Sequence, residues 1–219
     1  MATNINKIAE LPIFLGLSRT ELSAIAIETS FSMHHYKKGA TITQADKCHD
    51  SLSFITQGWV ELETVADDHS YRLTERIQAM HTIEPDKLFG MHRSFRSTYR
   101  ALTSCEVIRI DKDNLTHLIG KYFIVRLNFL NMICRKAQQA EHIPWKASAT
   151  DLKQRIAQFI KEHSYYPAGQ KCLYIKMTQL ANELNDSRIN ISNALNQLAD
   201  EEKIILRRGI IDIPALQLL

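Results

Sequence analysis

The spacing of apolar and polar residues changes character twice along the chain. Between residues 36 and 111, apolar and polar residues alternate over short runs that turn residues interrupt, as at Gln57-Gly58 and Pro85-Asp86. Because neighbouring side chains of a strand point to opposite faces, this alternation predicts a small all-β barrel or roll. Ser18, just before a short helical pattern, predicts a capped helix that closes one end of the roll.

From residue 112 to Pro144, apolar residues recur at helical spacing, which predicts one helix of about 30 residues. Its apolar positions form two stripes, so one stripe can pack on the roll. A second copy of the same helix is the natural cover for the other stripe. The alternative is a single helix buried between domains. The predicted dimer contact consists of Phe123, Leu127, Leu130, Cys134 and Ala137.

Residues 145–219 predict a strand at 173–175, two short helices joined by a turn at Asn185-Asp186, and a β-hairpin with a basic tip. Thr178 is the expected cap of the first helix and Ser187 that of the second. Two short helices joined by a tight turn are typical of a helix-turn-helix, whose second helix fits the major groove of DNA. The basic hairpin has the form of a wing that contacts phosphates.

At 100° per residue, Ile191 and Leu195 lie on the buried side of the second helix, so Ile189, Asn193 and Asn196 point outward. Asn can make a bidentate contact to adenine, and an exposed Ile fits a thymine methyl, so the face predicts A·T-containing sites. The alternative is that these polar side chains are only solvated. The expected DNA-contacting residues are Lys176, Thr178, Ser187, Arg188, Ile189, Asn190, Ser192, Asn193, Asn196, Arg207 and Arg208.

Composition adds limits rather than a function. With 219 residues, 45% apolar and 23% charged, the chain is long enough for two domains, and its net charge of +3 permits a polyanionic partner without requiring one. No apolar run is long enough to cross a membrane and no secretion signal is recognisable, so we expect a cytoplasmic protein. The four scattered cysteines predict reduced, mostly buried thiols. No enzyme motif is present, so we do not expect an enzyme.

Several segments together resemble the CRP/FNR family of bacterial transcription regulators over nearly the whole chain. The segments that carry the resemblance are residues 11–14, 36–39, 54–58, 83–86, 89–90 and 101–105 in the roll, and Ser187-Arg188 with Ile191-Ser192. The resemblance implies an α+β fold with a β-roll like a cyclic-nucleotide-binding double-stranded β-helix (residues 1–111), a dimerisation helix (112–144) and a winged helix-turn-helix (145–219). It also implies a homodimer that binds a two-fold symmetric site on double-stranded DNA, and RNA polymerase as a partner if the protein activates.

The chain departs from the family where cyclic-nucleotide-binding members hold their ligand. Met91 follows Phe89-Gly90 where those members have a Glu, and Arg96-Ser97 comes too early to be the phosphate-binding pair. Cyclic AMP is therefore not expected, and the effector is unknown or absent. A different anionic effector could contact Arg93, Arg96, Ser97, Thr98 and Arg100, although an ordinary solvated basic face explains the same residues.

Other cofactors of the family are not expected either. The iron–sulfur members need an N-terminal cysteine cluster, whereas the first cysteine here is Cys48. Isolated histidines such as His34 and His117 are usually ordinary residues rather than haem ligands. A rival function is a ligand-sensing roll that acts through a protein partner rather than through DNA.

Overall fold

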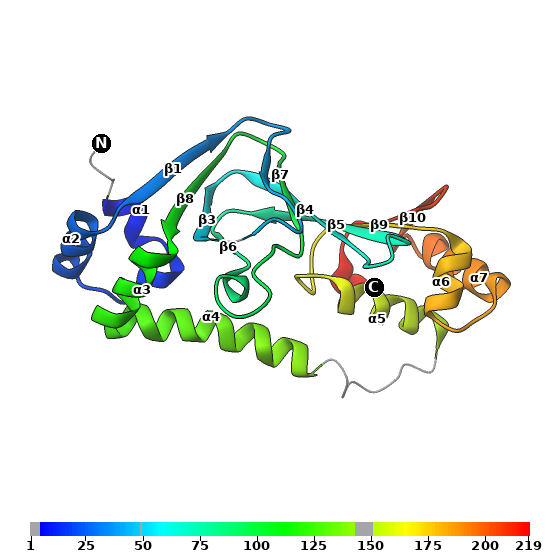
Figure 1. The fold of residues 1–219 in the computed structure, drawn as a ribbon. Helices are drawn as coiled ribbons and strands as arrows, with labels where there is room; N and C mark the ends of the chain where they lie inside the picture. Colours follow the sequence, from blue (N-terminus) through cyan, green and yellow to red (C-terminus); the bar gives the residue numbers. More distant parts are fainter. Residues whose placement is uncertain (1–4, 49, 143–150) are drawn as a thin grey trace. The chain divides into compact units, whose positions relative to one another are not determined.

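The computed structural model of the protein describes residues 5–48, 50–142 and 151–219, which form two compact units (Figure 1). The roll unit contains the chain up to Val60 and then Ile77–His142. The C-terminal unit contains Glu61–Arg76 together with the chain after position 142. Within the described residues, no helix combines the length and the apolar character that crossing a membrane requires.

The roll unit consists of short strands flanked by helices, as the alternating pattern predicts. Its strands are β1 (Phe31–Tyr36), β2 (Thr41–Thr43), β3 (Ser51–Gln57), β6 (His81–Ile83), β7 (Thr98–Ala101) and β8 (Cys105–Asp111). Its helices are α1 (Ile5–Ala9), η1 (Pro12–Phe14), α2 (Arg19–Glu28), η2 (Pro85–Lys87), α3 (Lys112–Lys121) and α4 (Phe123–His142). The predicted cap of α2 is confirmed, because the Ser18 side chain accepts the N–H of Glu21.

Antiparallel pairing in the order β1-β8-β3-β6 builds one sheet of the roll, and β2 pairs with β7. In the β3–β8 register, Leu52 lies opposite Ile110 and Phe54 opposite Ile108. These four side chains are at most 1% exposed and pack with apolar residues of the helices. Figure 1 shows α3 and α4 lying along one side of these strands.

Gly58 forms the predicted turn between β3 and β4. Its φ is 98°, a left-handed conformation that favours glycine. A Cβ at this position would lie 2.5 Å from the Ser104 carbonyl oxygen, which is closer than any real contact. The sequence therefore needs a glycine here both for the backbone conformation and for the space.

The prediction of one continuous helix after residue 111 is wrong. The structure has two helices, α3 and α4, separated at Tyr122, whose backbone is extended with φ −108° and ψ 113°. The Tyr122 ring packs against the core and its hydroxyl donates to a Glu28 carboxylate oxygen at 2.7 Å. These tertiary contacts break the helix at one residue, which leaves the apolar periodicity almost unchanged.

The two apolar stripes of α4 are confirmed. Val125 and Phe129 are buried in the core of the roll unit, at 0% and 8% exposure. The other stripe is open in this single chain: Phe123 is 66% exposed, Leu127 41% and Leu130 51%, and Cys134 and Ala137 are exposed too. One face of α4 thus supports the roll, and the described residues of the roll unit leave the other face exposed.

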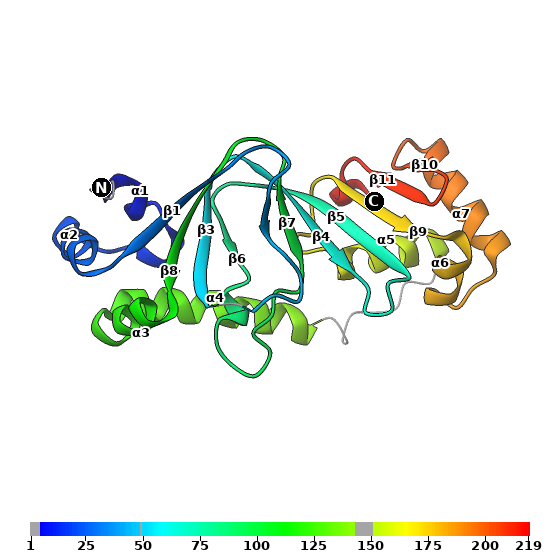
Figure 2. The same cartoon turned by 45° about the horizontal axis from the view of Figure 1, so that its top comes forward.

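The C-terminal unit is a sheet packed against helices. Its strands are β4 (Trp59–Val65) and β5 (Tyr71–Gln78), whose outer ends belong to the roll unit, and β9 (Lys171–Ile175), β10 (Ile205–Arg207) and β11 (Ile210–Ile213). Its helices are α5 (Leu152–His163), α6 (Met177–Glu183), α7 (Arg188–Asp200) and η4 (Leu216–Leu218). The strand order is β10-β11-β9-β5-β4, and Figure 2 shows β5, β9 and β11 side by side.

The unit boundaries differ from the expected division at residues 111 and 145. The hairpin residues 61–76 cluster with the C-terminal unit, because β5 pairs antiparallel with β9 from Tyr71 opposite Ile175 to Glu75 opposite Lys171. Leu73 of the hairpin is 3% exposed and belongs to the same core as Leu173. The expected boundary near residue 145 lies outside the described residues.

The expectation that most thiols are buried is also wrong. Cys105 is buried and Cys172 half-buried, whereas Cys48 and Cys134 are exposed. All four are free thiols in this structure. Within the described residues, no group of three or more His, Cys, Asp or Glu side chains could hold a metal ion.

Candidate nucleic-acid interface

The predicted orientation of α7 is confirmed. Ile191, Ala194, Leu195 and Leu198 are between 0% and 5% exposed and pack in the core of the C-terminal unit. The helix begins after Ser187, whose hydroxyl oxygen accepts the backbone N–H of Asn190 at 3.1 Å. The apolar stripe and the cap together fix which side of α7 faces outward.

The outward side of α7 carries amide and methyl groups. Ile189 is 73% exposed, and Asn193 and Asn196 are exposed one and two turns further along the helix. Arg188 is exposed at the start of α7, and Ser192 is half-buried. This face therefore offers an aliphatic group and amides, which are the groups that can contact a thymine methyl and adenine edges.

Asn190 differs from the other amides because its side chain has a partner. Its Nδ2 donates to Asp186 Oδ1 at 2.9 Å, and Arg155 donates to the second oxygen of the same carboxylate at 2.9 Å. The hydrogen bond from Asn190 and the neighbouring Arg155 hold the pKa of Asp186 below its ordinary value. Asn190 therefore orients the start of α7, and its amide is less available for a base than that of Asn193.

The first short helix begins two residues earlier than the predicted cap implies. Lys176 is the residue before α6 and its side chain is exposed, whereas Thr178 is the second residue of the helix and caps nothing. The prediction of Thr178 as the cap is therefore wrong. Both side chains lie at the N-terminal end of α6, where the free backbone N–H groups of a helix attract anions.

The predicted basic hairpin is present as β10 and β11. Gly209, at φ 73°, forms the turn, and the adjacent Arg208 is exposed. Arg207 is paired across the hairpin, because its Nε donates to Asp212 Oδ2 at 2.8 Å. Arg208 is thus the cation at the tip, and Arg207 braces the two strands.

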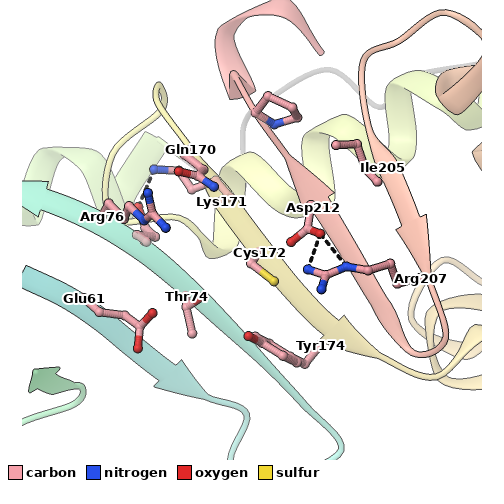
Figure 3. Close-up of a pocket in the computed structure, with 12 residues that line it drawn as sticks. Glu61, Thr74, Arg76, Gln170, Lys171, Cys172, Tyr174, Ile205, Arg207 and Asp212 are labelled. Carbon is pink, nitrogen blue, oxygen red and sulfur yellow. Dashed lines mark hydrogen bonds and ion pairs between the residues drawn. The ribbon is translucent and has the colours of Figure 1, made fainter. Parts of the chain in front are cut away.

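The sheet beside this hairpin contains a cavity of about 480 Å³. Figure 3 shows Cys172, Tyr174, Arg207 and Asp212 on the strands that line it. Burial, together with a hydrogen bond to Asp212, raises the pKa of the Cys172 thiol to about 11. Cys172 is therefore a neutral thiol near pH 7, which is unsuited to nucleophilic or metal chemistry.

A buried ion pair that the sequence did not indicate holds the hairpin residues 61–76 in the C-terminal unit. Lys171 donates to a Glu75 carboxylate oxygen at 2.6 Å, and both side chains are at most 2% exposed. The N–H groups of Tyr165 and Tyr166 also donate to Glu75, at 2.5 and 3.2 Å. The available signal was that Lys171 shares a strand face with Leu173 and Ile175, a buried position where lysine needs a partner.

The basic residues of the roll unit lie apart from these elements in the sequence, before and on β7. Arg93, Arg96 and Arg100 are exposed and Thr98 is half-buried, whereas Ser97 is buried. The Thr98 hydroxyl accepts the N–H of Ala45 at 3.1 Å. Arg96 is therefore on the surface of the roll unit.

Comparisons with known proteins agree with this architecture. Residues 33–122 match the family model of the cyclic nucleotide-binding domain. A comparison with curated protein sequences found no match.

Similar solved structures cover most of the chain. The catabolite activator protein of Thermus thermophilus has 18% identity over 94% of this chain and 95% of its own, with a TM-score of 0.54. The sensor domain of the transcriptional regulator DNR from Pseudomonas aeruginosa has 14% identity over 68% of this chain and 100% of its own, with a TM-score of 0.51. FixK2 from Bradyrhizobium japonicum has 16% identity over 86% of this chain and 95% of its own, with a TM-score of 0.47. At identities this low, the first two matches establish a shared fold and nothing more.

Proposed function

From a chain that has the CRP/FNR fold and a domain of the cyclic nucleotide-binding family, we propose a sequence-specific DNA-binding transcription regulator. In this proposal α6, the turn and α7 form a helix-turn-helix, and β10 with β11 forms its wing. The observation that carries the proposal is the outward Ile189 and Asn193 on a helix whose Ile191 and Leu195 are buried. The regulator acts as a homodimer on a two-fold symmetric, A·T-containing operator, and RNA polymerase is a further partner if it activates.

Each exposed group of the interface has a distinct role in this proposal. Asn193 and Asn196 read adenine edges and Ile189 contacts a thymine methyl, while Arg188 reaches a guanine or a phosphate. Lys176 and Arg208 bind the phosphate backbone on either side of α7 and so position the helix without reading sequence. Affinity should fall with salt because these cations release counterions from the DNA.

Selection of bound sequences from random DNA tests the proposal directly. The expected consensus is two-fold symmetric and contains A·T pairs where Ile189 and Asn193 contact bases. A consensus made only of G·C pairs would reject the assigned amide contacts. Failure to select any sequence would favour the rival in which the C-terminal unit docks on a protein partner.

Single substitutions then assign the reading residues. Asn193→Ala should weaken binding to the selected site by about 1–3 kcal/mol, which is about 5-fold to 150-fold, and relax the preference at one base pair. Asn182→Ala is the matched control, because Asn182 is an exposed amide on α6 rather than on the outward face of α7. An equal loss for both variants would argue against base reading by Asn193.

The exposed stripe of α4 supports the homodimer. Its residues at 123, 127, 130, 134 and 137 are spaced alternately by four and three, which is the spacing of the contact positions in a left-handed coiled coil. In a parallel pair of helices, each contact position faces its own copy. The two copies of Cys134 would therefore meet across the two-fold axis.

Cross-linking with a short bis-maleimide measures this arrangement. The wild-type protein should form a covalent dimer, Cys134→Ser should abolish the cross-link, and Cys48→Ser should leave it intact, because Cys48 is the other exposed thiol. Sedimentation of the untreated protein should give twice the mass of one chain. A mass of one chain across a wide concentration range with DNA present would contradict the dimer.

A further inference from the structure

Glu84 holds its carboxylate in an unusual position between β6 and η2. The residue is 5% exposed and its backbone is left-handed, with φ 32° and ψ 61°. One carboxylate oxygen accepts the N–H of Arg96 at 2.7 Å, and the other accepts the N–H of Ser97 at 3.1 Å. Both oxygens are therefore engaged by two consecutive backbone donors.

This arrangement is costly for the chain in two respects. A left-handed conformation strains any residue with a β-carbon, and a buried carboxylate is unfavourable unless hydrogen bonds compensate it. Burial raises the pKa of Glu84, while the hydrogen bonds from Arg96 and Ser97 oppose that rise. The two hydrogen bonds from backbone N–H groups are what offset these penalties.

The segment that carries these two donors is held by hydrogen bonds on both sides. The N–H of Phe95 donates to the Lys47 carbonyl at 3.0 Å, and the Phe95 carbonyl accepts the N–H of Asp46 at 2.8 Å. Beyond the pair, Thr98 accepts the N–H of Ala45. The N–H groups of Arg96 and Ser97 are thus presented together, and consecutive N–H groups presented together form an anion-binding concavity.

We propose that Glu84 is a built-in anion that fills this concavity in place of the phosphate of a cyclic nucleotide. The domain matches the cyclic nucleotide-binding family, yet its Arg96 side chain points outward and its two adjacent N–H groups already hold a carboxylate. The interior is also occupied by aromatic side chains, since Tyr99 is fully buried and its ring stacks on His81 at 6.0 Å between centroids. The residues of this roll therefore do not fit a cyclic nucleotide.

Hydrogen–deuterium exchange of the full chain tests the first half of the proposal. Glu84→Gln has only one acceptor oxygen for two donors, so exchange of the Arg96 and Ser97 amides should accelerate at least about tenfold, because one N–H loses its partner. Glu202→Gln is the matched control, because Glu202 is also left-handed, at φ 58°, but exposed. Unchanged exchange in Glu84→Gln would overturn the proposal.

Ligand binding tests the second half. The wild-type protein should show no heat of binding with cyclic AMP, cyclic GMP or inorganic phosphate, and none of them should slow exchange at Arg96 and Ser97. Glu84→Gly removes the carboxylate and relieves the left-handed strain, so phosphate should slow exchange there, beyond the effect of chloride at equal ionic strength. Binding of a cyclic nucleotide to the wild type, or no response of a folded Glu84→Gly to phosphate, would overturn the proposal. If Glu84→Gly does not fold, exchange in Glu84→Gln and wild-type binding decide.

Discussion

Each unit of the molecule buries a glutamate, and the two glutamates are compensated differently. Glu84 in the roll unit and Glu75 in the C-terminal unit each accept two consecutive backbone N–H groups. Glu75 also accepts the ammonium group of Lys171, whereas the hydrogen bonds to Glu84 in the described structure come from backbone alone. A lysine side chain thus balances the carboxylate in one unit, whereas backbone donors alone hold the carboxylate in the other.

The difference separates a structural link from a ligand substitute. The Glu75–Lys171 pair joins β5 to β9 and, through Ala168 and the two tyrosines, a loop as well, so its value lies in connecting segments. Glu84 connects the end of β6 to the segment just before β7, through donors that any anion of suitable size could use. Removing the partner of Glu75 should therefore be the most damaging change, since no ligand could replace it.

Lys171→Met should destabilise the C-terminal unit by about 3–5 kcal/mol, because it leaves the Glu75 carboxylate buried without its cation. Differential scanning calorimetry should show the transition of this unit moving to lower temperature. Circular dichroism during urea unfolding offers an independent probe.

The double variant Glu75→Gln with Lys171→Met is the control for that prediction. Removing both charges should restore much of the lost stability, because a neutral pair has a far smaller desolvation cost. If the single variant were as stable as the wild type, the ion pair would not be what holds β5 against β9.

Burial in the roll should also make a charged histidine unfavourable, and the pH dependence of stability can test this at His81. His81 is 4% exposed, and burial lowers its pKa to about 4, with a smaller contribution from Lys136. The unfolded chain binds the proton near pH 6.5, so stability should be full above that pH and be lost progressively down to pH 4. The total loss should be about 3 kcal/mol.

Urea unfolding between pH 4 and pH 7.5 measures this loss, and His81→Gln is the comparison because glutamine does not titrate. The variant should lose less stability than the wild type over that range. If stability fell equally with pH in the two proteins, His81 would not be buried as a neutral base.

Periodicity explains what the sequence could predict. The buried Ile191 and Leu195 recur at helical spacing, so the outward position of Ile189 and Asn193 followed from helix geometry alone. The second stripe of α4 followed in the same way. In both cases the information lies within about four turns of one helix, where side-chain direction is fixed by local geometry.

Contacts between residues that are distant in the sequence account for what the sequence could not predict. Glu75 and Lys171 are 96 residues apart, so no local pattern predicts that they pair. For the same reason, no local pattern assigns the hairpin residues 61–76 to the C-terminal unit. The helix break at Tyr122 depends on Glu28, 94 residues away. Glu84 was visible only as part of a turn, because the left-handed backbone and the two donors appear only once β7 is placed.

Substitution of Ser187 should have the smallest effect of the series. Its neutral hydroxyl oxygen accepts one exposed N–H group, whereas each of the two glutamates accepts two N–H groups with a buried carboxylate. Ser187→Ala should cost about 1 kcal/mol of stability, the usual value of a helix cap, and Ser187→Thr should retain most of it. Both variants can be compared by urea unfolding and by binding to the selected operator. If Ser187→Ala weakened DNA binding far more than its loss of stability explains, while Ser187→Thr did not, the hydroxyl would be contacting DNA as well as capping α7. A loss of stability as large as that of Lys171→Met would instead contradict the ranking, because it would make an exposed cap as important as a buried ion pair.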